Sequence, residues 1–173
     1  MLPQILNFIE QFFKDHKDIS GSVLDVGSRD ISNLGDIRYA IPSTLRYTGM
    51  DISGGQNVHL VMDAYDIKKK LKPESYDVVM CTEVLEHIAK PWIIVENMRW
   101  VLKPGGWLII TVPSLNHGRH DWPGDYYRFF ETVLGEVFFE GMDNIYTLTV
   151  KFPLVGGSDL KPDAILGYAQ KRS

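Results

Sequence analysis

The sequence predicts an α/β domain with seven strands in a mostly parallel sheet and helices on both faces. Seven short apolar runs recur along the chain, and most of them are bounded by the turn-forming residues Gly, Pro, Asp or Ser. The run at residues 76–81 is almost continuously apolar, as in a central strand that is buried on both faces. Helical patterns stand between several of the runs, as expected for parallel strands joined by crossovers.

The composition is that of one globular domain with a substantial core. The chain has 173 residues, of which 45% are apolar and 23% are charged, with a net charge of -4. This charge gives no general attraction to nucleic acid and argues against a nucleic-acid partner. The single cysteine excludes an intrachain disulfide and favours a reducing, cytoplasmic location. Neither a signal-peptide pattern nor an apolar run of roughly 20 residues is present, so no membrane contact is expected.

The first part of the chain is expected to cover the sheet and then to enter it. Residues 1–17 carry apolar side chains at helical spacing, which predicts an amphipathic helix over one face of the sheet. The first strand, at residues 23–26, stops at Gly27. Residues 30–39 are expected to form a short helix or an irregular turn.

The second and third strands, at residues 46–52 and 58–64, lie unusually close together in the sequence. Only residues 53–57 separate them, whereas a parallel crossover normally needs about ten residues or more. Either the crossover has lost its helix, or the two strands are not parallel neighbours. The first alternative, a reduced crossover, is the prediction.

The rest of the chain alternates helical and strand patterns without a linker that would divide it, so residues 1–173 are expected to form a single domain. Helices are predicted at residues 66–72, from 83–88 with a restart at Pro91, and at 130–140. Strands are predicted at residues 76–81, 107–112, 144–152 and 164–169.

Small or acidic residues stand where the predicted strands end. Asp25 and Gly27 lie at the first end, Asp51 at the second, Asp63 at the third and Glu83 just after the fourth. In an open α/β sheet, ligands bind beyond the carboxyl ends of the strands. These residues therefore predict a ligand-binding edge with groups suited to a nucleoside.

Five segments match, in order and at similar spacing, the motifs of a known family. They lie at residues 23–27, 49–52, 76–79, 83–87 and 102–113. Through them the chain resembles the class I S-adenosylmethionine-dependent methyltransferases. The resemblance implies a Rossmann-like sheet whose last strand is antiparallel, and S-adenosylmethionine as the cofactor.

The resemblance also implies roles for the strand ends. Gly27 would let the backbone approach the methionine part of the cofactor, and Asp51 would accept hydrogen bonds from both ribose hydroxyls, since a carboxylate has two acceptor oxygens. Asp63 would accept from the adenine amino group, and the Ala64 amide would donate to a ring nitrogen. Thr82 and Glu83 would lie near the amino-acid tail. The expected cofactor-binding residues are Asp25, Gly27, Ser28, Asp51, Ile52, Asp63, Ala64, Thr82 and Glu83.

Two positions in this set have a second interpretation. Asp25 could instead be a buried acid that bonds to backbone amides and holds the turn. Ser28, Arg29 and Asp30 follow Gly27 where the family has a glycine-rich turn. Serine can replace a glycine only if its backbone dihedrals stay in an ordinary region.

The long loop after the fifth strand is expected to overhang the reacting methyl group. Transfer to a hydroxyl is helped by a general base, and the candidate catalytic residues are His120, His117 and His87. Asp121 could orient a histidine, and Arg128 could hold a polar substrate. Alternatively, the aromatic residues of this loop form a small core, and Arg128 pairs with Asp121 or with Asp125.

The spacing of Glu83, Glu86 and His87 would place all three on one face of a helix. Together with a later histidine, such a face could bind a divalent cation, in a pattern similar to metal-dependent RNA 2′-O-methyltransferases. Many small-molecule methyltransferases carry the same run without a metal, so no metal ligands are predicted.

The predicted function is S-adenosylmethionine-dependent methyl transfer to a small polar acceptor, such as a sugar or another hydroxyl compound. One alternative is a non-catalytic or degenerate module that keeps the fold. The other is a metal-assisted RNA 2′-O-methyltransferase. The reduced crossover could leave part of the sheet exposed, which would suit a homodimer.

Overall fold

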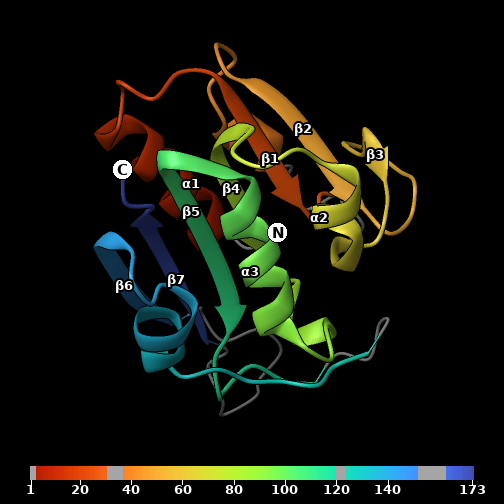
Figure 1. Cartoon of the computed structure of the whole chain (residues 1–173). Coiled ribbons are helices and arrows are strands. Elements are labelled where there is room, and N and C mark those ends of the chain that lie inside the picture. Colours follow the sequence, from red (N-terminus) through yellow and green to blue (C-terminus); the bar gives the residue numbers. More distant parts are fainter. Residues whose placement is uncertain (1–2, 31–36, 120–123, 152–162) are drawn as a thin grey trace.

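The computed structural model describes residues 3–30, 37–119, 124–151 and 163–173 (Figure 1). They form a single seven-stranded sheet with the order β3-β2-β1-β4-β5-β7-β6. The predicted fold class is confirmed. The strands are β1 (Ser22–Val26), β2 (Arg46–Asp51), β3 (Leu60–Val61), β4 (Tyr76–Thr82), β5 (Leu102–Pro113), β6 (Asp143–Lys151) and β7 (Asp163–Gln170).

Among the described strands, six run in the same direction, and the final strand, β7, runs in the opposite one. The pairs β2–β3, β1–β2, β1–β4 and β4–β5 are all parallel. Strand β7 lies between β5 and β6 and is antiparallel to both. The expectation of an antiparallel last strand is therefore confirmed, and the carboxyl ends of β3, β2, β1 and β4 meet at one edge of the sheet.

Helical elements cover both faces of the sheet, as predicted. On one face, α1 packs Ile9, Phe12 and Phe13 into a cluster that includes Val23 of β1. On the other face, α3 packs against Leu24 of β1, the next residue along the strand (Figure 1). The helical elements are α1 (Pro3–Asp15), η1 (Ile37–Ala40), η2 (Ala64–Asp66), α2 (Ile67–Lys70), η3 (Leu85–His87), α3 (Pro91–Val101) and η4 (Val133–Phe138).

The reduced crossover between β2 and β3 is confirmed. Met50 and Asp51 pair with Leu60 and Val61 in parallel, and no helix lies between the two strands. The predicted strand at residues 58–64 is too long, since β3 has only two residues. Beyond Val61, the Met62 amide still donates to the Asp51 carbonyl at 2.9 Å, and Asp63 then caps the 3₁₀ turn η2, so the strand cannot continue to residue 64.

The helix predicted at residues 83–88 is wrong. Glu83 has a left-handed backbone with φ +53°, and its amide donates to the Thr111 carbonyl of β5 at 3.0 Å. These constraints keep the chain beside β5, so only the 3₁₀ turn η3 forms before α3 begins at Pro91. The helix predicted over residues 130–140 is a π-helical turn, η4, and β5 begins at Leu102, before the predicted residue 107.

Asp77 ties three adjacent strands together at the amino edge of the sheet. Its carboxylate accepts hydrogen bonds from the Ser22 amide at 2.7 Å and from the Lys103 ammonium group at 2.9 Å. Burial alone would raise the pKa of Asp77, but the hydrogen bonds from Lys103 and Ser22 outweigh it and lower the pKa below its ordinary value. The ionised form is therefore favoured in the folded chain.

Asp77→Ala is expected to reduce the free energy of unfolding at pH 7 by about 2 kcal/mol, because it removes charge-assisted hydrogen bonds. Since the native pKa is lowered, this contribution is present above the unfolded-state pKa of about 4 and is lost as the pH falls through the native pKa. Urea unfolding at pH 7 and pH 3 measures both effects. Glu96→Ala, which removes an exposed ion pair with Lys68, is the matched control. Equal stability of the Asp77 variant and the wild type at pH 7 would contradict this role.

Candidate active site

The carboxyl edge brings together residues that are far apart in the sequence. Gly27, Asp51 and Thr82 lie at or just beyond the ends of β1, β2 and β4, and Asp63 follows β3. Because these four strands are parallel neighbours, the groups share one edge. The sheet order thus brings the predicted site residues of these four strands to the same edge.

The turn after β1 requires a glycine. Gly27 has φ +83°, and a Cβ atom there would lie 2.2 Å from Cγ2 of Val84. Its amide and that of Ser28 both donate to the Met50 carbonyl, at 2.8 and 3.0 Å. The turn is therefore closely held between β2 and the segment that follows β4.

Ser28 and Arg29 lie beside the loop that replaces the crossover helix. Ser28 is buried, and its hydroxyl donates to the Asn57 carbonyl at 3.3 Å. A Cβ at Gly49 would lie 2.5 Å from the Ser28 hydroxyl oxygen, and one at Gly55 would lie 2.8 Å from Cγ of Arg29. Glycines of β2 and of the loop thus make room for the side chains of Ser28 and Arg29.

Asp25 holds β1 to β2 through a side chain. Its Oδ2 accepts a hydrogen bond from the Tyr47 hydroxyl at 2.8 Å, and the residue is buried. The alternative interpretation expected backbone amides as donors, and the structure shows a phenol from the neighbouring strand among its donors. This contact favours a supporting role for Asp25, and direct binding of the cofactor stays a prediction.

The end of β2 offers a polar and an apolar group side by side. Oδ1 of Asp51 accepts from the Ser53 amide at 2.9 Å, which fixes the carboxylate while its other oxygen can accept further hydrogen bonds. Ile52 is 66% exposed. The Asp51 carboxylate could therefore bind a ring that carries hydroxyl groups, and the Ile52 side chain could pack against a flat apolar ring next to it.

The turn after β3 is rigidly capped. Oδ1 of Asp63 accepts from the Tyr65 amide at 2.9 Å, and buried Asn97 of α3 donates to the Ala64 carbonyl at 3.1 Å. Ala64 is the first residue of η2, where a backbone amide has no acceptor within the helical turn. Its amide is thus suited to donate to a ligand.

Glu83 is fixed by a residue that the sequence analysis did not identify. The Thr111 hydroxyl donates to Oε1 of Glu83 at 2.9 Å, across the β4–β5 pair. Thr111 is fully buried within the otherwise apolar run Leu108 to Val112. A polar residue inside a buried run was the signal that could have indicated this role.

Three carboxylates gather around the end of β4. Burial raises the pKa of the Cys81 thiol well above its ordinary value, and the nearby charges of Asp25, Glu86 and Glu83 raise it further. A neutral, fully buried thiol is a packing group and not a nucleophile. Acidic side chains thus surround the end of this strand.

Cys81 is expected to react with iodoacetamide at pH 8 at least roughly tenfold more slowly in the native chain than in urea, because the thiolate is the reactive form and the native thiol is buried. Mass spectrometry of timed samples measures both rates. Similar rates in the two conditions would show that β4 opens freely.

Arg128 joins the two parts of the loop that follows β5. Its guanidinium group donates to the carbonyls of His117 and Gly118, at 2.8 and 2.7 Å, and forms a bidentate pair with Asp125. The hydrogen bond from Arg128 to Asp125 raises the pKa of Arg128, against the effect of burial. The structure shows the pairing of Arg128 with Asp125, and Asp121 lies outside the described residues.

The same loop is attached to the turn after β4. The Tyr126 amide donates to the Glu86 carbonyl at 2.8 Å, and Nδ1 of His87 contacts the Gly124 carbonyl. Nε2 of His87 lies 3.6 Å from the carboxylate of buried Glu86. Both ring nitrogens of His87 thus face acceptors.

The structure places two of the three candidate catalytic histidines. His87 and His117 are both half-buried, on the turn after β4 and the loop after β5. His120 lies outside the described residues, as does Asp121. The common helical face expected for Glu83, Glu86 and His87 does not exist, because Glu83 precedes the 3₁₀ turn in a left-handed conformation.

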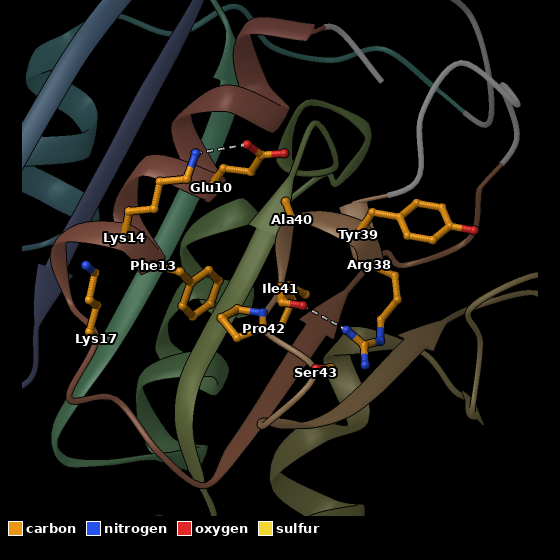
Figure 2. Close-up of a pocket in the computed structure, with 10 residues that line it drawn as sticks. All are labelled: Glu10, Phe13, Lys14, Lys17, Arg38, Tyr39, Ala40, Ile41, Pro42 and Ser43. Carbon is orange, nitrogen blue, oxygen red and sulfur yellow. Dashed lines mark hydrogen bonds and ion pairs between the residues drawn. The ribbon is translucent and has the colours of Figure 1, made fainter.

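Among the residues that the structure describes, no three His, Cys, Asp or Glu side chains are grouped to hold a metal ion. A cavity of about 710 Å³ lies elsewhere, between α1 and η1 (Figure 2). Phe13 and Ile41 line it together with Lys14 and Lys17, and none of the predicted site residues does. No helix in the described ranges is long and apolar enough to cross a membrane.

A family model described as a methyltransferase domain matches residues 2–140. The chain belongs to this methyltransferase-domain family. The predicted membership in the S-adenosylmethionine-dependent methyltransferases of class I is confirmed, and with it the predicted cofactor.

Relatives of this methyltransferase domain include the ubiquinone biosynthesis O-methyltransferase of Paraburkholderia xenovorans. The two are 31% identical over 112 residues, which cover 58% of this chain and 48% of the relative. The chain thus spans about half the length of the curated relatives that it matches.

Solved structures share the fold of this methyltransferase domain. A SAM-dependent methyltransferase from Archaeoglobus fulgidus superposes with a TM-score of 0.69 at 14% identity, over 96% of this chain and 94% of the other. Phosphoethanolamine N-methyltransferase 2 of Haemonchus contortus, in complex with S-adenosyl-L-methionine, gives 0.68 at 16% identity, over 96% and 53% of the two chains.

Proposed function

We propose that this domain transfers the methyl group of S-adenosylmethionine to a hydroxyl of a small polar molecule, such as a sugar. The observation that carries the proposal is the row of polar groups at the carboxyl ends of four adjacent strands, in a chain of the methyltransferase-domain family. The curated relatives are named O-methyltransferases, which supports an oxygen acceptor. The solved structures include one named an N-methyltransferase, so the fold is compatible with acceptors of more than one kind.

The nucleoside part of the cofactor fits the ends of β2 and β3. The Asp51 carboxylate would accept the two ribose hydroxyls while Ser53 fixes its orientation. The exposed side chain of Ile52 would pack against adenine. Asp63 and the Ala64 amide would bind the polar edge of the same ring, on a turn that Asn97 holds in place.

The amino-acid tail fits the ends of β1 and β4. Its ammonium group would lie near the carboxylate of Glu83, which Thr111 orients, and near Thr82. The turn at Gly27 would bring the backbone close to the tail. The carboxyl groups of Asp25, Glu83 and Glu86 around the end of β4 would also favour the positively charged sulfonium.

The cofactor, when bound, supplies a methyl group that is already activated for displacement. The protein then has to hold the acceptor oxygen in line with that group and help to remove its proton. Arg128 and its contacts fix the loop that carries His117, and His117 and His120 are the proposed candidates for the base.

His87 is better suited to support than to proton transfer. A ring whose two nitrogens both face acceptors has no lone pair directed at a substrate. We therefore assign His87 to the attachment between the turn after β4 and the loop after β5. A His87→Asn variant should retain the contact to Gly124 and lose less activity than His87→Ala.

Binding and turnover test the proposal separately. Calorimetry of the full chain with S-adenosylmethionine is expected to give a dissociation constant of about micromolar order, and absence of binding would overturn the proposal. Mass spectrometry of a panel of sugars and other hydroxyl compounds should then detect a product 14 Da heavier. Binding without any product would favour the non-catalytic module, and RNA methylation that a chelator abolishes would favour the metal-assisted alternative.

A further inference from the structure

Strand β6 forms one edge of the sheet and exposes apolar side chains there. It pairs with β7 on one side only, within the part of the chain that the structure describes (Figure 1). Ile145, Tyr146 and Leu148 are 45%, 42% and 40% exposed. An edge strand with open backbone groups and apolar side chains is a template for pairing with another chain.

The apolar rows that cross the sheet end at this strand. Tyr146 stacks on Tyr168 of β7 with ring centroids 5.1 Å apart, and Leu148 is the register partner of Leu166. Because β6 is the last strand in the order, no further described strand continues these rows beyond Tyr146 and Leu148. A further strand beside β6 would extend both rows.

The charges of β6 match those of a second β6 that runs in the opposite direction. The strand begins at Asp143 and ends at Lys151. An antiparallel pair with its two-fold axis at Thr147 places Tyr146 of each copy opposite Leu148 of the other. The same arrangement brings Asp143 and Lys151 of different copies to the same end, with an offset from the bulge between Asp143 and Tyr146. A parallel pair would align like charges instead.

We propose that β6 pairs antiparallel with β6 of a second copy of this chain, so that the two sheets form one continuous sheet. Such an interface is isologous and closes at two copies. The strand is complementary to itself both in its apolar row and in its charges, and this is why a second copy is the occupant. Exposed Phe130 and Val137 lie in the segment just before β6 and would add area at the flanks.

The interface lies away from the proposed methyl-transfer site. The cofactor groups sit on β3, β2, β1 and β4, whereas β6 is at the opposite end of the strand order. The inference therefore goes beyond the proposed function and does not depend on it. A chain that binds no cofactor can still dimerise, and a monomeric chain can still bind the cofactor.

Sedimentation equilibrium of the full chain over a range of concentrations tests the interface. The wild type is expected to dimerise, and Leu148→Lys should raise the dissociation constant of the dimer at least roughly tenfold, since each introduced ammonium group would lie opposite Tyr146 of the other copy within the apolar row. Val61→Lys, on the other edge strand of the sheet, is the matched control and should dimerise normally. A monomeric wild type, or a dimer that only Val61→Lys disrupts, would overturn the proposal.

A charge exchange tests the antiparallel arrangement itself. Lys151→Asp should weaken the dimer several-fold, because it places acidic groups from both copies at each end of the pair. The double variant Asp143→Lys, Lys151→Asp should restore it in part, since opposite charges meet again between the copies, although the bond from Arg172 to position 143 is lost. Loss of dimer in the single variant without recovery in the double variant would contradict antiparallel pairing of β6. Circular dichroism checks that each variant is folded.

Discussion

Asp51→Ala is expected to weaken the binding of S-adenosylmethionine about 100-fold, because a carboxylate that accepts two ribose hydroxyls contributes roughly 3 kcal/mol. The side chain is well placed for this task. It ends β2 beside the turn of β1, and the Ser53 amide fixes one of its oxygens. Calorimetry on the purified variants measures the change directly.

Two companion variants separate the role of the charge from the effect of any substitution. Asp51→Asn keeps an oxygen for the Ser53 amide and should lose only about tenfold in affinity. Asp66→Ala removes a nearby acid that binds Lys69 at the surface and should bind the cofactor as the wild type does. Unchanged affinity of Asp51→Ala would mean that the ribose is held elsewhere, and the assignment of this edge would then be wrong.

Arg128→Ala is expected to reduce the free energy of unfolding by about 3–5 kcal/mol, because it removes the bidentate ion pair that Arg128 makes with a buried carboxylate. The side chain of Asp125 is only 2% exposed. The substitution also removes the bonds to the His117 and Gly118 carbonyls, so the two parts of the loop should separate. We therefore expect methyl transfer to fall more strongly than cofactor binding.

The double variant Arg128→Ala, Asp125→Ala distinguishes the cause of this loss. Without the buried carboxylate, it should be more stable than Arg128→Ala alone, although the loop remains detached. Arg128→Lys should be intermediate, since an ammonium group cannot reproduce the bidentate pair. Urea unfolding gives the stabilities, and single-turnover assays with bound cofactor give the rates. Equal stability of Arg128→Ala and the double variant would rule out the remaining Asp125 carboxylate as the main cause.

The strand pattern of this chain could be predicted because each strand satisfies a local rule. Apolar runs ending in Gly27, Asp51 or Thr82 become parallel strands whose ends share an edge, and five intervening residues were enough to indicate a crossover without a helix. The positions of site residues along the strands follow from that order alone.

What could not be predicted depends on contacts between distant segments. Arg29 lies against Gly55, and Ser28 lies against Gly49. The side chains of the turn after β1 are therefore accommodated by glycines in β2 and in the loop that follows β2. Glu83 leaves the helical conformation because Thr111, which is 28 residues away, binds both its amide and its side chain. Neither pairing has a periodic signature in the sequence.

The position of β7 has a consequence for synthesis of the chain. Strand β6 is made first, yet in the sheet it is joined to β5 only through β7. Until residues 163–170 have left the ribosome, β6 has no partner and its apolar rows are open, which is the kind of exposure that leads nascent chains to associate wrongly. A stop codon before residue 163 would therefore remove β7, an interior strand of the sheet. Because β6 would then have no strand to pair with, the truncated product should be a substrate for chaperones and proteases.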